Sequence, residues 1–154
     1  MDGATSLVHA SCIAVDGRAA LFTGPSGAGK SDLALRCLGQ SYDLSGRLLR
    51  AVLVADDQVL LERSGDRILA RSPLAIAGKL EVRGVGIVDL PNTPQAELDV
   101  LVELTDPTKI ERLPEPGAKV LILGLELPVI RVAPFQASAP LKVLLSLVAN
   151  VRPV

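Results

Sequence analysis

The chain has 154 residues, 49% of them apolar but only 2% aromatic, so we expect one domain, residues 1–154, with an aliphatic core. Its net charge of -1 excludes a strong general attraction to nucleic acid or an anionic membrane surface, and its apolar runs end well before the roughly 18 residues of a membrane span. The N-terminus lacks a signal-peptide pattern, and Cys12 and Cys37 lack metal or redox spacing, so we expect a cytoplasmic protein with reduced thiols.

The first forty residues predict two strands, a glycine-rich loop and a helix. Residues 7–15 and 18–24 have the apolar composition of strands, and Asp16-Gly17 between them is typical of a tight turn. Residues 24–29 predict a loop. Residues 30–39 carry apolar side chains three and four positions apart, which predicts a helix that the final glycine can end.

The rest of the chain predicts mainly strands. The expected elements are a buried strand over 48–57, a hairpin over 58–73, an extended stretch over 79–91, strands over 98–105 and 119–132, and a closing helix over 140–151. The order strand, glycine loop, helix, strand implies an α/β fold. We therefore expect a nucleotide-binding core of the phosphate-loop (P-loop) type, with a mixed, strand-rich sheet and few helices.

The glycine-rich loop matches the phosphate-loop pattern G-x-x-x-x-G-K-[ST] at every fixed position. The matching residues are Gly24, Pro25, Ser26, Gly27, Ala28, Gly29, Lys30 and Ser31. Its place between a predicted strand and a predicted helix is the context that the motif requires. Backbone N–H groups and the helix N-terminus can bind phosphate oxygens, the lysine can reach the β- and γ-phosphates, and the serine hydroxyl can ligate Mg²⁺. The alternative is a glycine turn without a ligand.

Two further places carry polar groups that suit phosphoryl transfer. Asp56 and Asp57 follow the predicted buried strand, where one acid could organise Mg²⁺ and the other accept a proton. A solvated turn is the alternative for this pair. The second place is the segment Leu80, Glu81, Val82, Arg83, Gly84, Val85, Gly86, Ile87, Val88 and Asp89. Its Glu–Arg pair suits metal and phosphate contacts, but physics alone favours an edge strand with a surface ion pair. His9, the only histidine, is by itself more typical of a structural residue.

In order, the phosphate loop, "LVADD" and "LEVRGVGIVD" resemble the catalytic domain of the HPr kinase/phosphorylase family. The resemblance implies ATP and Mg²⁺ as cofactors and an HPr-like phosphocarrier protein of a sugar phosphotransferase system as substrate. It implies that Asp56 is the catalytic base, that His9 orients Asp56, and that Ser31, Glu81 and Asp57 serve the metal. Lys30 would bind the transferred phosphoryl group, and "KIERLPEPG" assigns a catalytic role to Arg112, for which a solvated loop arginine is the alternative.

The resemblance leaves several questions open. The acceptor could instead be a small metabolite, or the chain could be a regulatory nucleotide-binding module without turnover; whether it forms a homo-oligomer is also open. The family carries a Gly-Arg-Asn sequence before its last helices, whereas the corresponding stretch here reads "PFQASAPLKV". We therefore expect the reverse reaction, phosphorolysis of phosphoserine, to be weaker than phosphorylation.

Overall fold

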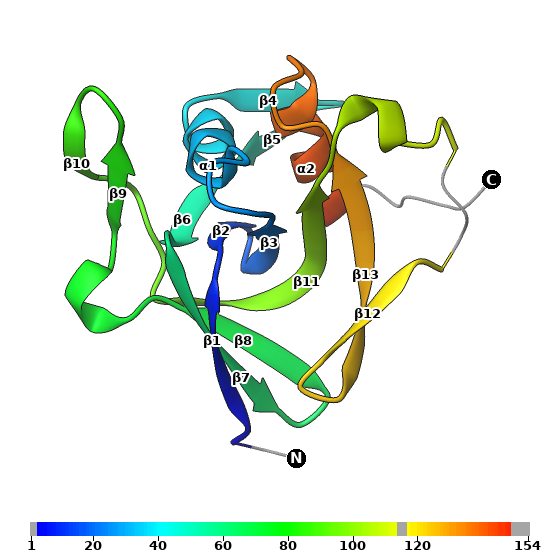
Figure 1. The fold of residues 1–154 in the computed structure, drawn as a ribbon. Coiled ribbons are helices and arrows are strands. Elements are labelled where there is room, and N and C mark those ends of the chain that lie inside the picture. The colour runs from blue at the N-terminus through cyan, green and yellow to red at the C-terminus, as the bar shows by residue number, and fades with distance from the viewer. Residues whose placement is uncertain (1–2, 114–116, 149–154) are drawn as a thin grey trace.

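The computed structural model describes residues 3–113 and 117–148. Two α-helices, two short 3₁₀-helices and thirteen strands are present in this part of the chain (Figure 1). In chain order the elements are β1 Thr5–His9, β2 Ser11–Val15, β3 Arg18–Thr23, α1 Lys30–Leu38, β4 Ser41–Leu44, β5 Arg47–Arg50, β6 Val52–Ala55, β7 Gln58–Ser64, β8 Arg67–Arg71, η1 Leu74–Ile76, β9 Lys79–Val82, β10 Gly86–Asp89, β11 Gln95–Leu104, η2 Pro107–Lys109, β12 Lys119–Ile122, β13 Leu125–Val132 and α2 Ala139–Val148.

Nine strands form one mixed sheet, organised around the long strand β11. Along one side β11 pairs in parallel with β3, which continues through β2 to β6. Along the other side it pairs first with β8, in antiparallel, and then with β13, in parallel. Strands β9–β10 and β4–β5 form two separate hairpins. The expected mixed, strand-rich sheet with few helices is therefore confirmed.

The strand directions bring four strand ends to one edge of the sheet. Strands β3, β11 and β13 are mutually parallel, and β6 runs in the same direction because it is antiparallel to β2, which is itself antiparallel to β3. Helix α1 begins at this edge, and six residues separate it from the end of β3. In open α/β sheets this carboxyl edge is where ligands bind, so the topology places the glycine-rich loop in the expected position.

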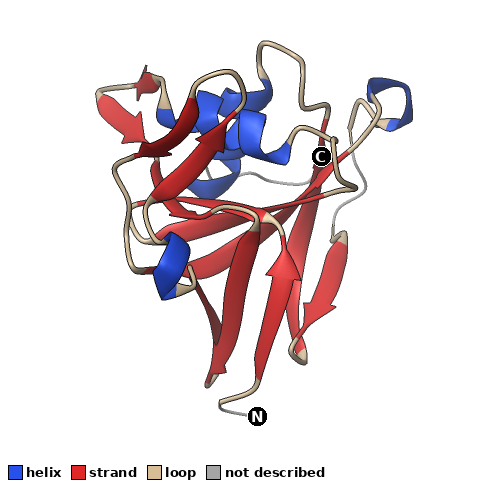
Figure 2. Cartoon of the chain, turned by 60° about the vertical axis from the view of Figure 1, so that its left-hand side comes forward, coloured by secondary structure: helices blue, strands red, loops and turns tan. Residues whose placement is uncertain are grey.

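Two hydrophobic clusters cover the two faces of the sheet. Helices α1 and α2 pack on one face, where Phe22, Leu33 and Leu144 are fully buried (Figure 2). The other cluster lies under the strands that curve around the opposite face. A bulge at Asp99 switches the side chains of β11 from one cluster to the other, because Leu98 pairs with Ala19 whereas Val100 pairs with Ala20. One strand thus supplies side chains to both cores.

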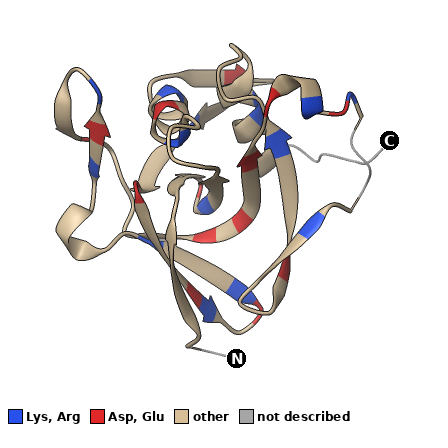
Figure 3. Ribbon diagram, in the orientation of Figure 1, with Lys and Arg blue, Asp and Glu red and all other residues tan. Residues whose placement is uncertain are grey.

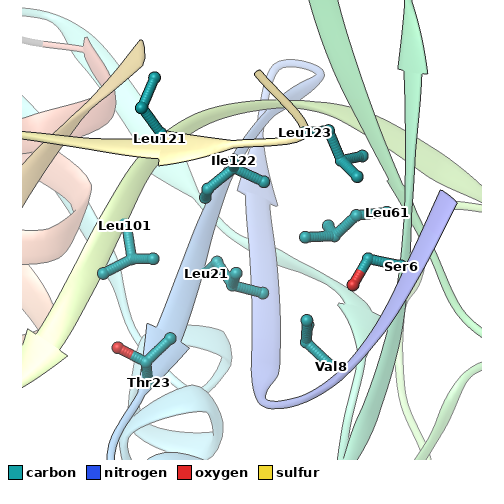
Figure 4. Close-up of a pocket in the computed structure, with 9 residues that line it drawn as sticks. All are labelled: Ser6, Val8, Leu21, Thr23, Leu61, Leu101, Leu121, Ile122 and Leu123. Atoms are coloured by element: carbon teal, nitrogen blue, oxygen red, sulfur yellow. The ribbon is translucent and has the colours of Figure 1, made fainter. Parts of the chain in front are cut away.

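A hollow of about 280 Å³ lies on the face away from the helices (Figure 4). Its lining is mostly aliphatic and consists of Ser6, Val8, Leu21, Thr23, Leu61, Leu101, Leu121, Ile122 and Leu123. None of these residues belongs to the motifs predicted to carry chemistry. The hollow reaches Thr23, the last residue of β3, but no residue of the glycine-rich loop lines it.

The structure corrects several predicted elements. Residues 7–15 are not one strand but two, since β1 ends at His9 and pairs with β7 while β2 pairs with β3. Residues 48–57 are likewise divided between β5 and β6, and β5 belongs to a hairpin with β4 that was not predicted. The strand expected over 119–132 is the hairpin β12–β13, which turns at Leu123 and Gly124.

The other elements are found where the sequence places them. The turn at Asp16-Gly17, helix α1 and the hairpin over 58–73 are confirmed, and Gly39 ends α1 by donating its N–H to the Leu35 carbonyl. The closing helix begins at Ala139, and its predicted residues 149–151 lie outside the described residues. In the described part of the chain, no helix has the length and apolar character needed to cross a membrane.

Candidate active site

The loop between β3 and α1 has the geometry of an anion site. The N–H of Ala28 donates to the Pro25 carbonyl and that of Leu33 donates to the Gly29 carbonyl. Among the described residues, the N–H groups of Gly29, Lys30, Ser31 and Asp32 have no acceptor. Unpaired N–H groups at a helix N-terminus attract phosphate oxygens through hydrogen bonding and the helix dipole. The fit to a phosphate group therefore holds at the level of the backbone.

Lys30 lies folded against this same loop. Its side chain is nearly buried, and its ammonium Nζ donates to the carbonyl oxygens of Gly24, at 2.6 Å, and Pro25, at 3.1 Å. These carbonyls are neutral acceptors, so phosphate oxygens, which carry charge, can replace them with a stronger hydrogen bond. The position suits a lysine that moves onto a bound phosphate.

Asp56 is a buried acid that holds the serine of the loop. Its Oδ1 accepts hydrogen bonds from Ser31 Oγ, at 2.8 Å, and from Ser11 Oγ, at 2.7 Å. Its Oδ2 makes no hydrogen bond within the described residues. Because the Ser31 hydroxyl hydrogen points to Asp56, the lone pairs of Oγ face away from the acid and can serve a cation. This is the arrangement by which a phosphate-loop serine and an aspartate hold Mg²⁺.

Ser11 was not singled out from the sequence. It is almost completely buried at the start of the apolar strand β2, with its hydroxyl satisfied by Asp56. A buried hydroxyl needs a hydrogen-bond partner. A single serine at the start of an apolar strand is therefore the sequence signal that could have identified Ser11.

Within the described residues His9 forms an ion pair with Asp57, and no ion pair joins it to Asp56. The orientation of Asp56 by the histidine stays a prediction. The distance from His9 Nδ1 to Asp57 Oδ1 is 3.2 Å, and both side chains are largely exposed. The reason for the pairing with Asp57 is local geometry. The chain turns at Asp57, which has a φ of 67°, so this carboxylate points outward while Asp56 points inward to the two serines.

The segment 80–89 forms most of the hairpin β9–β10, which Figure 1 shows beside α1. The hairpin is anchored to β6, the strand before Asp56, because the N–H of Leu53 donates to Pro91 and its carbonyl accepts from Thr93. Gly84, with a φ of 85°, lies in its turn, and a methyl group there would meet nothing within 4 Å. Glycine is therefore favoured here because of the positive φ, and not because another group packs closely against it.

The charges of this hairpin are arranged differently from a simple surface ion pair between Glu81 and Arg83. The ion pair that forms joins Lys79 to Asp89 across the base of the hairpin, at 2.9 Å. Glu81 and Arg83 are exposed and form no ion pair within the described residues. In Figure 3 basic and acidic positions are interspersed along the described strands and helices.

The remaining predicted residues are not brought together. Among the described residues, no group of three or more His, Cys, Asp or Glu side chains could hold a metal ion. Arg112 is exposed in the segment after η2, and no hydrogen bond or ion pair of the described residues joins it to Lys30 or Asp56.

A contact that the sequence did not reveal links the glycine-rich loop to the segment between β13 and α2. A methyl group placed on Gly29 would lie 2.9 Å from Cζ of Phe135, so the aromatic ring lies directly against the loop. Arg36 of α1 donates to the carbonyls of Pro134 and Gln136, which flank the ring. This segment therefore forms one wall of the candidate site.

The two thiols take no part in this chemistry. Both cysteines are buried, and burial raises the pKa of the Cys12 thiol far above its ordinary value. Burial also raises the pKa of Cys37 to about 12, against a smaller lowering by the charge of Arg36. Since only the thiolate is a good nucleophile, neither residue is a catalytic group.

The sequence of the chain is similar to a family of known kinases. A family model described as HPr Serine kinase C-terminal domain matches residues 3–152. The HPr kinase/phosphorylase of Bordetella pertussis is 35% identical over 133 residues, which are 79% of this chain and 40% of that protein. The HPr kinase/phosphorylase of Chlorobium chlorochromatii is 33% identical over 135 residues, or 80% of this chain and 38% of that protein. The chain thus spans about two fifths of the length of these curated relatives.

The fold agrees with a solved structure. The Hpr(Ser) kinase/phosphatase from Coxiella burnetii superimposes with a TM-score of 0.73 over 90% of this chain and 91% of that chain, at 24% sequence identity. At this identity the likeness shows the fold. The family model covers nearly the whole sequence, and the chain therefore belongs to the HPr serine kinase C-terminal domain family.

Proposed function

We propose that residues 1–154 act as one kinase domain that transfers the γ-phosphoryl group of ATP to a serine of an HPr-like phosphocarrier protein of a phosphotransferase system. The observation that carries the proposal is the hydrogen bond from Ser31 to the buried Asp56, at the start of a helix whose first N–H groups are unpaired. The names of the relatives support the choice of acceptor.

The loop binds the donor in this proposal. The N–H groups of Gly29 to Asp32 bind phosphate oxygens, and Lys30 exchanges its two carbonyl acceptors for the β- and γ-phosphates. Ser31 Oγ and exposed Glu81 supply hard oxygen ligands for Mg²⁺, a cation that prefers such ligands. When bound, the cation neutralises charge on the phosphates. Asp57, which directly follows Asp56, forms an exposed pair with His9 and can assist in holding the cation.

Asp56 has two oxygens for two tasks. Oδ1 fixes Ser31, while Oδ2, which has no protein partner in the described chain, accepts the proton of the incoming serine hydroxyl. The serine oxygen forms a bond to the γ-phosphorus as the bond to the β,γ-bridging oxygen breaks, and ADP leaves. Arg83 of the hairpin is exposed and has no ion-pair partner among the described residues, and Arg112 is also exposed, so either can approach the transferred group when the acceptor docks.

The test is incubation of the purified chain with γ-labelled ATP and HPr proteins, followed by mass spectrometry of the acceptor. Phosphoserine on HPr is expected, and it should disappear in Lys30→Met, which keeps the buried aliphatic stem but removes the cation. Thermal unfolding of this variant controls for the fold. ATP binding without phosphoserine on any HPr protein would contradict the acceptor. Labelling of a metabolite, together with continued ATP consumption, would then identify a small-molecule kinase. ATP binding with neither activity would identify a regulatory module.

A further inference from the structure

The aromatic ring of Phe135 lies beside the phosphate loop, and it is exposed instead of packed in a hydrophobic core. The chain contains two phenylalanines, one tyrosine and no tryptophan. Phe22 is fully buried in the core, whereas Phe135 is 71% exposed. The exposed ring touches the protein at its edge, where Cζ and Cε1 lie against Gly29. In a chain with so few aromatic residues, an exposed ring at this place is best explained by a ligand that covers its face.

The position of Phe135 follows from the topology. Strand β13 is parallel to β11, and β11 is parallel to β3, so the segment after β13 and the phosphate loop after β3 lie at the same edge of the sheet. The crevice outside this edge is where such sheets bind nucleotides. If the phosphates of a nucleotide lie in the loop, its base must lie beside the loop. The segment 133–138 borders the loop at Gly29 and is therefore one surface that the base can contact.

The segment that carries the ring is held by contacts from both helices. Arg36 of α1 donates to the Pro134 carbonyl and, at 3.5 Å, to the Gln136 carbonyl, and it is itself fixed at 2.9 Å by Asp32. Lys142 of α2 donates to the Gln136 side chain at 3.2 Å. Both helices therefore fix the segment that carries Phe135. Because this backbone is fixed before binding, only the side chain of Phe135 has to be ordered when a ligand stacks on it.

We propose that Phe135 is the base-stacking residue of the nucleotide site, so that the ligand is a nucleoside triphosphate with its phosphates in the loop and its base on this ring. The inference rests on the proposed function, because it takes the loop as a triphosphate site. Stacking on an aromatic face does not depend on the pattern of donors and acceptors of a base. Phe135 thus contributes affinity for the nucleoside and not a choice among bases.

The experiment compares two ligands that share their phosphates. Binding of Mg-ATP and of Mg-tripolyphosphate is measured by calorimetry for the wild type, Phe135→Ala, Phe135→Leu and Phe135→Trp. Leucine keeps an apolar contact with Gly29 but lacks a flat face. The alanine and leucine variants should lose roughly 5- to 100-fold in ATP affinity, the range for one stacked base, and keep their affinity for tripolyphosphate. The tryptophan variant should bind ATP as well as the wild type. Leu121→Ala, at a 69% exposed position on β12, is the matched control.

The outcomes separate the inference from the proposed function. Equal losses for ATP and tripolyphosphate in Phe135→Ala would show that the ring only shapes the loop around Gly29, which overturns the inference. Unchanged ATP binding in the alanine and leucine variants overturns it as well. A wild-type protein that binds neither ligand would contradict the proposed function itself, and with it the inference.

Discussion

Ser31 and Asp56 are 25 positions apart in the chain, yet Ser31 Oγ donates a hydrogen bond of 2.8 Å to Asp56 Oδ1. The first residue belongs to the opening turn of α1 and the second follows β6, two strands away from β3 in the sheet. The contact exists because β3 and β6 end at the same edge. It fixes the hydroxyl that is proposed to face the cation.

The first prediction separates the two serines that share Asp56. Ser31→Ala removes a proposed Mg²⁺ ligand, so a higher Mg²⁺ concentration should be needed for half-maximal phosphorylation. Ser11→Ala is the matched control. It removes a hydrogen bond to the same Oδ1, but Ser11 lies on β2 and not in the glycine-rich loop. Its Mg²⁺ requirement should stay near that of the wild type. Mg²⁺ titrations of both variants check this, and equal shifts would contradict the assignment of Ser31 to the cation.

The second prediction concerns the proton. Asp56→Asn keeps the size of the side chain and one acceptor oxygen for the serines, but it cannot take up a proton. The rate should fall by roughly 10²–10⁴-fold, the usual contribution of a general base, while the ATP affinity changes little. Transfer kinetics and calorimetry measure the two quantities separately. If affinity for Mg-ATP fell in step with the rate, Asp56 would act through Ser31 and the cation instead.

Local sequence signals predicted the parts of this site that depend on neighbouring residues. The loop from Gly24 to Ser31 and helix α1 were predictable, because backbone conformation there is set by glycines and by an apolar stripe. The acids after β6 were also found, since charge directly after an apolar strand is visible in the sequence. What they contact was not visible, and His9 faces Asp57 because the chain turns at that residue.

The missed features depend on contacts between distant segments. The bulge at Asp99 exchanges the two faces of β11, so alternation alone could not assign Leu98 and Val100 to different cores. The contact between Gly29 and Phe135 joins loops that follow different strands, and it requires knowledge that both strands are parallel to β11. The division of residues 48–57 came from hairpin pairing with β4, which an apolar run does not disclose.

The third prediction tests the hairpin β9–β10. Glu81 is exposed and has no ion-pair partner in the described chain, so Glu81→Gln should leave stability almost unchanged. It should nevertheless raise the Mg²⁺ concentration for half-maximal rate if the hairpin reaches the nucleotide. Asp89→Asn, which breaks the ion pair with Lys79 at the base of the same hairpin, is the control for a general loosening. A Mg²⁺ titration of Glu81→Gln that superimposes on the wild type would remove Glu81 from the metal site.

The fourth prediction concerns alkaline stability. Folding raises the pKa of Cys37 from 9.0 to about 12, so the unfolded chain loses this proton first as the pH rises. The contribution of the neutral, buried thiol is complete below the unfolded pKa and is lost as the pH rises through the folded pKa. The free energy of unfolding should therefore fall above about pH 9, and it should fall less steeply in Cys37→Ala. Urea unfolding at several pH values measures this, and identical slopes would contradict it.

The last prediction concerns the direction of the reaction. Phosphorolysis requires a second anion, inorganic phosphate, beside the phosphoserine, and a second anion needs a cation or free backbone donors. In place of the Gly-Arg-Asn sequence of the family, this chain has Ser138, Ala139 and Pro140 at the start of α2. The two cations that contact this segment also hold it in place, since Arg36 donates to the Pro134 and Gln136 carbonyls and Lys142 to the Gln136 side chain, so moving either one onto a phosphate would release the segment.

Phosphorylation of HPr should therefore exceed the reverse reaction by a wide margin. The assay supplies phosphoserine-HPr with excess phosphate and no ATP, and it follows release of pyrophosphate. Ala137→Arg, at an exposed position of the same segment, adds the missing guanidinium, and its planar fork binds phosphate better than a lysine. This variant should gain phosphorolysis without losing kinase activity. Dephosphorylation by the wild type as fast as phosphorylation would show that another cation, such as Arg83 or Arg112, holds the attacking phosphate.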